Sequence, residues 1–474
     1  MIKFKKINEN NLKQIQKHTK ESEYLVCDLS AGVIYMWDKV YNPEYAVFNQ
    51  TLIIKCNFKN KETAFFMPVG KDVEGGLLEI ENYAVKNSIP LNYLCVEESG
   101  VELLNKRYNG EIEASYNRNW SDYLYDYTEL LTLTGKKFSG QRNHINNFKK
   151  NYKDYKFKKL QPKDIPRVLE FLKEYKKEHN SNGKIEREEF KNTLKLVKNL
   201  NLAKYYGGYM EIDKKLCSFT IAEKVGKTFV IHVEKALRGY KGIYPTTFNE
   251  FLKQNQNEGF IYINREDDSG DLGLRTSKLQ YQPIKLINKH YVEVKKPMQI
   301  KKPPKLVGKK VVLSKILESD KQDYFKLYTN QTLNKHWGYD YKKDVKNPTE
   351  DAFYDMQFND FKRKDNLCLK IAKKNDTKMI GEVVLHNFTY QNTIEVGVRL
   401  FKKEQGKGYA KESVILACNY IINKLKKAPV AKCYIKNTLS LQMLMKAGFE
   451  ISTKDKKYYH LKYKIGDFIE KNKF

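Results

Sequence analysis

The chain lacks any apolar run near the ~18 residues that a membrane-spanning helix requires, and 30% of its 474 residues are charged. No apolar segment follows the basic residues 1–8, so a secretion signal is not expected. The seven cysteines are odd in number and the eight histidines are scattered. We therefore expect no disulfides and no metal site, and we predict a cytoplasmic protein without membrane insertion.

Acidic residues are in the minority, because 57 Asp and Glu face 87 Lys and Arg, a formal net charge of +30. A basic surface attracts phosphate, which favours a nucleic-acid partner. The excess is nearly all lysine and spreads along the chain, which a biased composition explains equally well. Composition favours the second interpretation, because a nucleic-acid-binding surface tends to cluster its charge and to use arginine.

The chain is too long for one hydrophobic core, and one segment interrupts it. Residues 296–305 hold three prolines and no acidic residue, which predicts an extended linker. We expect one domain at 1–295, divided into halves of about 1–135 and 136–295, and another at 306–474.

The C-terminal domain has the clearest periodicity. Residues 393–400 alternate between apolar and polar side chains, as in a strand with one buried face. Residues 410–425 then repeat apolar side chains at helical spacing. The same order of strand, glycine-containing loop and helix recurs at 228–255, so we predict an internal structural repeat.

The loop between that strand and helix is suited to an anion. Gly406 and Gly408 allow close approach of the backbone, Lys407 adds a cation, and the first helical amides lack partners. The alternative is that the two glycines only form a turn.

Several motifs extend this interpretation. They are Gln405-Gly406-Lys407-Gly408-Tyr409-Ala410, Asn437 with Ser440, Lys446-Ala447-Gly448-Phe449, Trp337-Gly338 and Gly381-Glu382. Together they resemble the GNAT acetyltransferase superfamily over residues 306–474, and most closely its ribosomal-protein and antibiotic acetyltransferase branch. The resemblance implies acetyl-CoA as the cofactor. It places the pyrophosphate on residues 405–410 and the pantetheine along Val398, Arg399 and Leu400, near Asn437, Ser440 and Lys446.

Catalysis in such a domain needs a group that removes a proton from the attacking amine. Glu395 is the first candidate because it lies opposite the core-facing Ile394 and Val396, and Glu382 is the second. Either could instead be an ordinary surface carboxylate. Many members of the superfamily carry a tyrosine where this chain has Leu444, so Ser440 or a water would have to protonate the leaving thiolate.

The N-terminal region contains two polar clusters. One includes Arg142 and Asn143, and the other includes Arg265, Glu266, Asp268, Arg275 and Lys278. These clusters resemble the phosphatidylglycerol lysyltransferase C-terminal-like family, which is built from two GNAT-like halves. The resemblance implies transfer from an activated acyl or aminoacyl donor, with these residues binding substrate. The alternative is a buried salt-bridge framework. Residues 238–242 match a cofactor loop only loosely, so this region is not expected to bind CoA.

The predicted fold class is mixed α/β, with two fused GNAT-like halves followed by one C-terminal GNAT domain. Three functions remain. The first is acetyl-CoA-dependent acetylation of a primary amine on a small molecule or a protein N-terminus. The second is aminoacyl-tRNA-dependent transfer by the N-terminal domain, and the third is a non-catalytic binding role. The sequence does not fix the oligomeric state.

Overall fold

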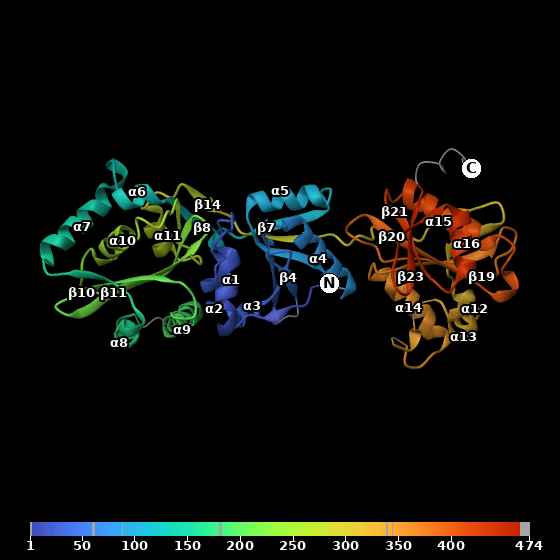
Figure 1. The fold of residues 1–474 in the computed structure, drawn as a ribbon, viewed down its shortest axis with the longest axis horizontal. Coiled ribbons are helices and arrows are strands. Elements are labelled where there is room, and N and C mark those ends of the chain that lie inside the picture. The colour runs from blue at the N-terminus through green and yellow to red at the C-terminus, as the bar shows by residue number, and fades with distance from the viewer. Residues whose placement is uncertain are drawn as a thin grey trace. The chain divides into compact units, whose positions relative to one another are not determined.

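A computed structural model describes residues 2–58, 62–87, 89–179, 183–337, 340–343 and 345–464. Gly338, half of the dipeptide noted above, lies outside these residues. The chain divides into an N-terminal unit, Met1–Ala84 with Ile89–Lys295, and a C-terminal unit, Lys296–Phe474 with Val85–Ser88. Figure 1 draws the former mainly in blue and green and the latter in orange and red.

Two sheets form the framework of the N-terminal unit. The first has the order β1-β2-β3-β4-β6-β15-β7, with β5 paired to β3, and the second has the order β14-β8-β13-β12-β11-β10-β9. The strands of the first sheet are β1 Lys5–Lys6, β2 Glu44–Phe48, β3 Thr51–Asn57, β4 Thr63–Phe65, β5 Val69–Gly70, β6 Leu91–Val96, β7 Ile112–Tyr116 and β15 His290–Val294. Those of the second are β8 Asp122–Asp126, β9 Lys156–Lys159, β10 Tyr206–Ile212, β11 Lys215–Val225, β12 Thr228–Ala236, β13 Tyr262–Asn264 and β14 Lys285–Ile287.

The two sheets exchange strands across the predicted boundary between the halves. Strand β8 precedes residue 135 but belongs to the second sheet, where it pairs with β13 and β14. Strand β15 comes from the end of the unit and lies between β6 and β7 of the first sheet. The sheets therefore do not follow the division expected at 135/136, because long-range pairing determines which sheet a strand joins.

The helices of this unit cover the sheets and bury their apolar faces. They are α1 Leu12–Thr19, α2 Ala31–Met36, α3 Asp38–Tyr41, α4 Val73–Lys86, α5 Glu98–Arg107, α6 Tyr127–Thr132, α7 Ser139–Asn151, α8 Ile165–Glu178, α9 Lys184–Lys198, α10 Ile243–Gln254 and α11 Leu272–Leu279. Phe229 and Phe251 stack at 5.1 Å between β12 and α10, in the core of the second sheet.

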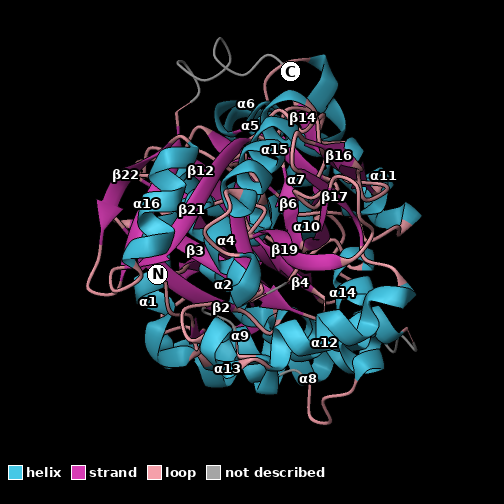
Figure 2. Cartoon of the chain, turned by 90° about the vertical axis from the view of Figure 1, so that its right-hand side faces the viewer, coloured by secondary structure: helices cyan, strands magenta, loops and turns pink. Residues whose placement is uncertain are grey.

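The C-terminal unit is built on one sheet with the order β16-β17-β18-β19-β20-β21-β23-β22. Its strands are β16 Leu306–Val307, β17 Val311–Lys315, β18 Leu367–Lys373, β19 Met379–His386, β20 Thr393–Leu400, β21 Ala428–Tyr434, β22 Phe449–Lys454 and β23 Tyr458–Tyr463. Its helices are α12 Lys321–Thr329, α13 Gln331–Asn334, α14 Glu350–Lys362, α15 Tyr409–Asn423 and α16 Thr438–Ala447. Figure 2 shows α15 and α16 beside β21, in agreement with their contacts.

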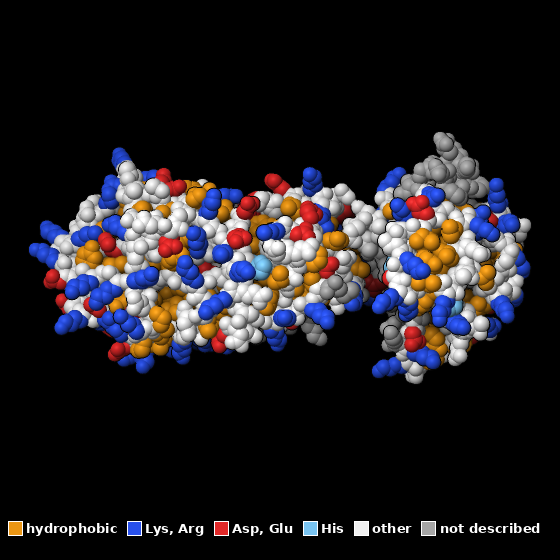
Figure 3. Space-filling view, viewed as in Figure 1, with side chains coloured by type: hydrophobic (Ala, Val, Ile, Leu, Met, Phe, Trp, Pro, Cys, Tyr) orange, Lys and Arg blue, Asp and Glu red, His pale blue; other side chains and the backbone are white. Residues whose placement is uncertain are grey.

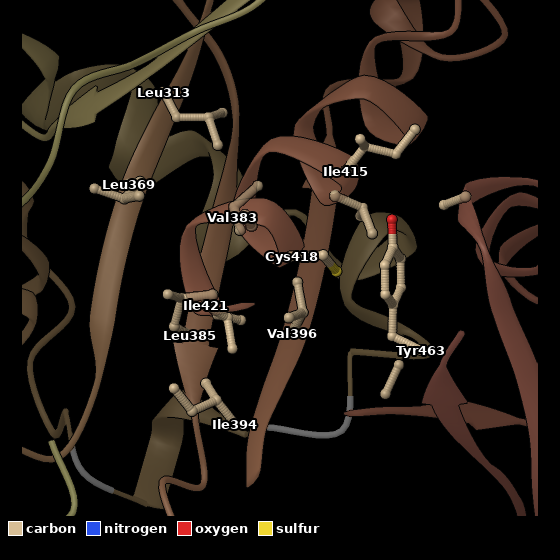
Figure 4. Close-up of a cluster of buried hydrophobic side chains, with 14 of the residues drawn as sticks. Leu313, Leu369, Val383, Leu385, Ile394, Val396, Ile415, Cys418, Ile421 and Tyr463 are labelled. Carbon is tan, nitrogen blue, oxygen red and sulfur yellow. The ribbon is translucent and has the colours of Figure 1, made fainter. Parts of the chain in front are cut away.

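The core of this unit lies between the sheet and α15. Ile394 and Val396 of β20 pack toward Cys418 and Ile421 of the helix (Figure 4). The alternation in β20 and the apolar stripe of α15 therefore bury the same interface, which fixes the end of β20 next to the start of α15. On the opposite face, α12 contacts β19 and α14 contacts β18.

The predicted linker forms no helix or strand between 296 and 305. It is nevertheless anchored, because Met298 and Ile300 are buried in the core of the C-terminal unit. Its apolar residues therefore belong to that unit's packing.

Candidate functional site

Strands β20 and β21 separate along their length. They are parallel neighbours but pair only from Thr393↔Ala428 to Glu395↔Val430. On its other side β20 pairs with β19 as far as Leu400. The backbone after Glu395 therefore has one side free of the β21 ladder, as an extended ligand would require. Leu400 is the exception, because its carbonyl accepts a hydrogen bond from Gln405 Nε2 at 3.1 Å.

The corner between β20 and α15 is open. Gly406 and Gly408 have φ values of 77° and 84°, and Gly408 is the N-cap of α15. A Cβ on Gly406 would meet no atom within 4 Å, and one on Gly408 would meet only Lys310 Nζ at 3.7 Å. The amide of Glu412 donates to the carbonyl of Gly408. Within the described ranges, the helix amides before it have no partner in the helix and are available to an anion.

Lysines surround this corner. Lys310 Nζ lies 3.5 Å from the carbonyl oxygen of Lys407. Lys407 and Lys373 both pair with the buried Glu404, at 3.0 and 3.2 Å. The hydrogen bond from Lys407 lowers the pKa of Glu404, which stays ionised and holds both ammonium groups near the loop. This arrangement favours a polyanion such as a diphosphate.

The equivalent corners of the N-terminal unit are filled. Strands β12 and β13 are also parallel and joined over three pairs, and α10 also begins after a left-handed glycine, Gly242. There, however, a Cβ would lie 2.5 Å from the carbonyl oxygen of His144. At the start of α4, Asp72 accepts a hydrogen bond from the amide of Gly75 at 2.8 Å. Of these three corners, only that of α15 is open.

Glu395 lies at the point where β20 and β21 separate. Its Oε2 accepts a hydrogen bond from Asn387 at 2.7 Å, and its Oε1 lies 3.9 Å from His386 Nε2. Burial lowers the pKa of His386, against the opposing effect of Glu395, so the imidazole is neutral at pH 7. Gly397 lets the Trp337 ring pack against this face, because its Cβ position lies 3.1 Å from that ring and 3.6 Å from His386 Nε2. Sequence reasoning missed His386, although it pairs with Glu395 across the strands.

Glu382 has a different environment. It is fully buried and pairs with Arg399, whose Nε lies 2.6 Å from its Oε1. The Arg399 guanidinium also lies 3.9 Å from the ring centre of Tyr328 and 4.4 Å from that of Trp337. Burial raises the pKa of Glu382, although Arg399 opposes this. The structure therefore separates the two carboxylate candidates and places Glu395, not Glu382, at the point of strand separation.

The second C-terminal motif begins α16. The Asn437 side chain caps this helix by accepting a hydrogen bond from the amide of Ser440 at 3.3 Å. Ser440 is half-buried, Lys446 is exposed at the other end of the helix, and Leu444 is buried in the core. Two of the expected cofactor contacts, Asn437 and Lys446, therefore lie at opposite ends of α16.

The polar residues of the N-terminal unit form separate pairs. Arg265 is held by Glu234 at 2.7 Å, Asp268 by Arg275 at 2.8 Å, and Lys278 donates to the carbonyl of Arg265 at 2.6 Å. Arg142 instead donates to the carbonyls of Leu133 and Gly135, and Asn143 is exposed. The residues of 265–278 thus contact one another, whereas Arg142 contacts the loop at 133–135.

A buried lysine joins the two sheets of this unit. Lys289 Nζ lies 2.9 Å from Asp28, 2.8 Å from Asp122 and 3.2 Å from Asp267. Burial works against the charged form of Asp28, but the attraction of Lys289 outweighs burial. The pKa of Asp28 therefore lies below its ordinary value. Ligand atoms of Cys27, Asp28 and Asp122 lie within 4.8 Å of one another, a spacing that could suit a cation. The ammonium of Lys289 already supplies positive charge there.

A second buried group contains a histidine between two carboxylates. His232 Nδ1 lies 2.9 Å from Glu266 and Nε2 lies 3.3 Å from Glu223. Burial alone would lower the pKa of His232, but the two carboxylates raise it to about 9. Glu223 also accepts a hydrogen bond from the amide of Gly32 in α2 at 2.8 Å. These contacts explain part of the polar cluster as a framework.

Part of the lysine excess is concentrated in one segment, in contrast to the even spread expected from composition. Between residues 136 and 163 only Asp154 is acidic, and this basic segment contains Lys136, Lys137, Arg142, Lys149, Lys150, Lys153, Lys156, Lys158, Lys159 and Lys163. It covers α7 and the edge strand β9. Lysine and arginine are visible around the end of the N-terminal unit where Figure 1 labels α7 (Figure 3). A window count of charge could have found it in the sequence.

No helix within the described ranges is both long and apolar enough to cross a bilayer.

Comparison with known proteins gives two family matches. The family described as "Phosphatidylglycerol lysyltransferase, C-terminal" matches residues 20–293, more than half of the chain. The family described as "Acetyltransferase (GNAT) domain" matches residues 310–450, which include the open corner and Glu395.

Similar individual proteins say less about activity. A solved structure of a conserved protein of unknown function from Bacteroides thetaiotaomicron VPI-5482 is 31% identical, has a TM-score of 0.59, and covers 62% of this chain and 100% of its own. An uncharacterized protein of Mycoplasmoides gallisepticum, MYCGA3080, is 26% identical over 204 residues, 41% of this chain. The match spans 63% of that relative, less than two thirds of its length.

A GNAT-family acetyltransferase from Bacillus anthracis is 18% identical and covers 34% of this chain and 96% of its own, with a TM-score of 0.29. That likeness adds no argument to the family matches. The chain belongs to the phosphatidylglycerol lysyltransferase C-terminal family through residues 20–293 and carries a GNAT acyltransferase domain after it.

Proposed function

We propose that residues 306–474 are an acetyl-CoA-dependent N-acetyltransferase that acts on a primary amine of a small molecule or a protein N-terminus. The observation that carries the proposal is the open corner at Gly406 and Gly408, next to a strand whose ladder to β21 ends at Glu395. An anion at the corner and an extended arm along β20 would bring the arm's end to Glu395. The two compared corners of the N-terminal unit do not offer this combination.

Acetyl-CoA, when bound, supplies the thioester that donates the acetyl group. In the reaction the amine nitrogen forms a bond to the acetyl carbon and the carbon–sulfur bond breaks. The amine must be neutral to attack, so it has to lose a proton. In this proposal Glu395 accepts that proton, which is supported by the hydrogen bond of 2.7 Å with which Asn387 fixes its carboxylate. Neutral His386, 3.9 Å from Glu395, offers a second acceptor on the same face.

The thiolate must gain a proton to leave as the thiol. Leu444 cannot donate one, whereas Ser440 supplies a hydroxyl in the second motif, at the start of α16. We assign this step to Ser440 or to a water beside it. Glu382 is assigned to positioning, because its carboxylate is bound to Arg399.

Two measurements test the proposal. Calorimetric titration with CoA should show saturable binding, and acetyl-CoA with a library of primary amines should release free thiol. Absence of CoA binding would overturn the proposal, whereas binding without transfer to any amine would favour the non-catalytic role.

The basic segment favours a second function, in which the N-terminal unit takes an aminoacyl group from tRNA. Lys137, Lys149 and Lys158 are held by acidic partners at 2.7, 2.9 and 2.7 Å. Among the described residues, no ion pair involves the exposed lysines at 136, 150, 153, 156, 159 and 163. Such lysines can neutralise a phosphate backbone.

Binding of tRNA measured against salt tests this function. Replacing Lys150, Lys153 and Lys156 with glutamine should reduce the slope of log K against log salt by about 2 to 3. The control variant replaces two surface lysines of the C-terminal unit, Lys454 and Lys462, with glutamine, which should leave the slope unchanged. A slope that is equal in both variants would contradict the assignment.

A further inference from the structure

One face of the C-terminal sheet continues from Glu395 across two further strands. Glu395 lies opposite Val430, and Lys432 and Tyr434 follow at two-residue steps on the same side of β21. Tyr434 pairs in turn with Tyr458 of β23. The intervening Ala431 and Cys433 are buried on the opposite face. We call the surface of His386, Glu395, Lys432, Tyr434, Lys457 and Tyr458 the acceptor face.

Two lysines on the acceptor face lie against a pair of tyrosines. The rings of Tyr434 and Tyr458 are 4.5 Å apart between centres. Lys432 Nζ lies 4.3 Å from the Tyr458 ring centre, and Lys457 Nζ lies 5.3 Å from that of Tyr434. Both lysines are exposed while both tyrosines are half-buried. The rings therefore hold the two ammonium groups beside an aromatic surface.

The acidic groups of this surface already have partners. Glu395 is bonded to Asn387 at 2.7 Å. Asp455, in the turn before β23, is bonded to His460 at 2.8 Å and accepts from the amide of Lys457 at 2.7 Å. Among the described residues, neither Lys432 nor Lys457 forms an ion pair with a carboxylate. Positive charge on this face is thus left for a ligand.

We infer that the acceptor is an amine that also carries an anionic group, a carboxylate or a phosphate, which binds at Lys432 and Lys457 while the amine lies at Glu395. This inference rests on the proposed acetyltransferase function and narrows its substrate class. The position of Lys432 supports it, because Lys432 lies two residues beyond Val430, the partner of Glu395, on the same face. Burial is the main cause of the lowered pKa of His386, and the charge of Lys432 adds to it. A polyamine would instead place its second cation against two lysines.

Paired acceptors of known charge test the inference. With saturating acetyl-CoA, kcat/KM is measured for tyrosine and tyrosine amide, for O-phosphoethanolamine and ethanolamine, and for spermidine. The first pair tests a carboxylate and the second a phosphate. The anionic member of at least one pair should be preferred by about tenfold, which corresponds to about 1.4 kcal/mol and lies within what a charge–charge contact near a protein surface contributes. Spermidine should be the poorest acceptor. Tyrosine amide has a less basic amine than tyrosine, so a larger fraction of it is neutral and able to attack. This difference in ionisation works against the expected preference for tyrosine.

Charge variants locate the effect. Lys432→Glu should abolish the preference, and Lys432→Gln should reduce it without introducing an acid. Lys454 of β22 is the matched control, because its Nζ also lies beside a tyrosine ring, 5.3 Å from the ring centre of Tyr459. Tyr459 follows Tyr458 along β23 and pairs with Lys454. Lys454→Glu should leave the preference unchanged.

The outcomes separate the two proposals. If neutral amines or spermidine are acetylated as well as the anionic amines, or if Lys432→Glu retains the preference, the inference is overturned and the acetyltransferase function stands. If CoA does not bind, or neither these five amines nor any amine of the library is acetylated, the proposed function fails and the inference falls with it.

Discussion

Glu395 and Val430 form the last cross-strand pair between β20 and β21. Beyond this pair β20 keeps its partner β19, and its other edge leads to the open corner at Gly406. The carboxylate of Glu395 thus lies where the sheet opens, 3.9 Å from His386. Four predictions concern the chemistry and the stability that follow from the structure.

Removing the charge of Glu395 should slow acetyl transfer without weakening cofactor binding. Glu395→Gln keeps the size of the side chain but loses the proton acceptor, so kcat should fall roughly 10²-fold or more. Glu450→Gln is the control, because Glu450 is bound to Lys462 at 3.3 Å on β22. An unchanged kcat in Glu395→Gln, measured with the same amine, would remove Glu395 from the mechanism.

His386 should contribute to the pH dependence of the rate. Its pKa lies below 6.5 because of burial, so it accepts a proton at neutral pH and loses this capacity as the pH falls through that lowered value. His386→Gln should lower kcat about tenfold and make the acidic side of the profile less steep than in the unmodified chain. Using one amine for both proteins cancels the amine's own ionisation. Identical profiles would mean that His386 carries no proton.

The stability of the N-terminal unit should decrease in alkaline solution. The pKa of His232 is about 9 in the folded chain against 6.5 ordinarily. Because its pKa is raised on folding, protonated His232 stabilises the folded state fully below pH 6.5. This stabilisation is lost as the pH rises through about 9. Hydrogen exchange of β11 and β12 should therefore accelerate over this range beyond the chemical rate. His232→Gln should remove most of that dependence, and a dependence that persists in the variant would assign it to other groups.

Lys289 should be among the most sensitive positions of that unit. Lys289→Met leaves Asp28, Asp122 and Asp267 without their shared cation, and breaking such a buried pair costs about 3–5 kcal/mol. Lys285→Met is the comparison, since Lys285 is half-exposed and pairs with Glu98 at 3.4 Å, a contact worth under about 1 kcal/mol. Denaturant unfolding measures both. Equal losses would mean that the buried network adds nothing to stability.

The sequence predicted the elements of the C-terminal unit well because periodicity and packing agree there. The alternation at 393–400 matches β20, and the apolar stripe at 410–425 matches α15 at 409–423 within two residues. The mixed α/β class and both family resemblances are confirmed by the matches. Local pattern suffices where one face of each element meets one core.

Long-range pairing was less accessible. Nothing local in residues 122–126 indicates that β8 joins the second sheet, or that β15 returns to the first. His386 became a candidate only through its register with Glu395. Lys289 contacts Asp28, which lies near the other end of the unit in sequence, so only the fold reveals that cluster. The residue roles proposed for the cofactor and the substrates stay predictions.

Titration of CoA into two alanine variants tests the central claim most directly. Gly406 and Gly239 have φ values of 77° and 89°, and a Cβ on either meets no atom within 4 Å, so alanine strains both loops by a similar ~1–2 kcal/mol. The unmodified chain and Gly239→Ala should bind CoA equally, and Gly406→Ala should bind at least about tenfold more weakly, because the strain falls on the loop that holds the diphosphate. No binding by the unmodified chain, or equal binding by Gly406→Ala, would contradict the account.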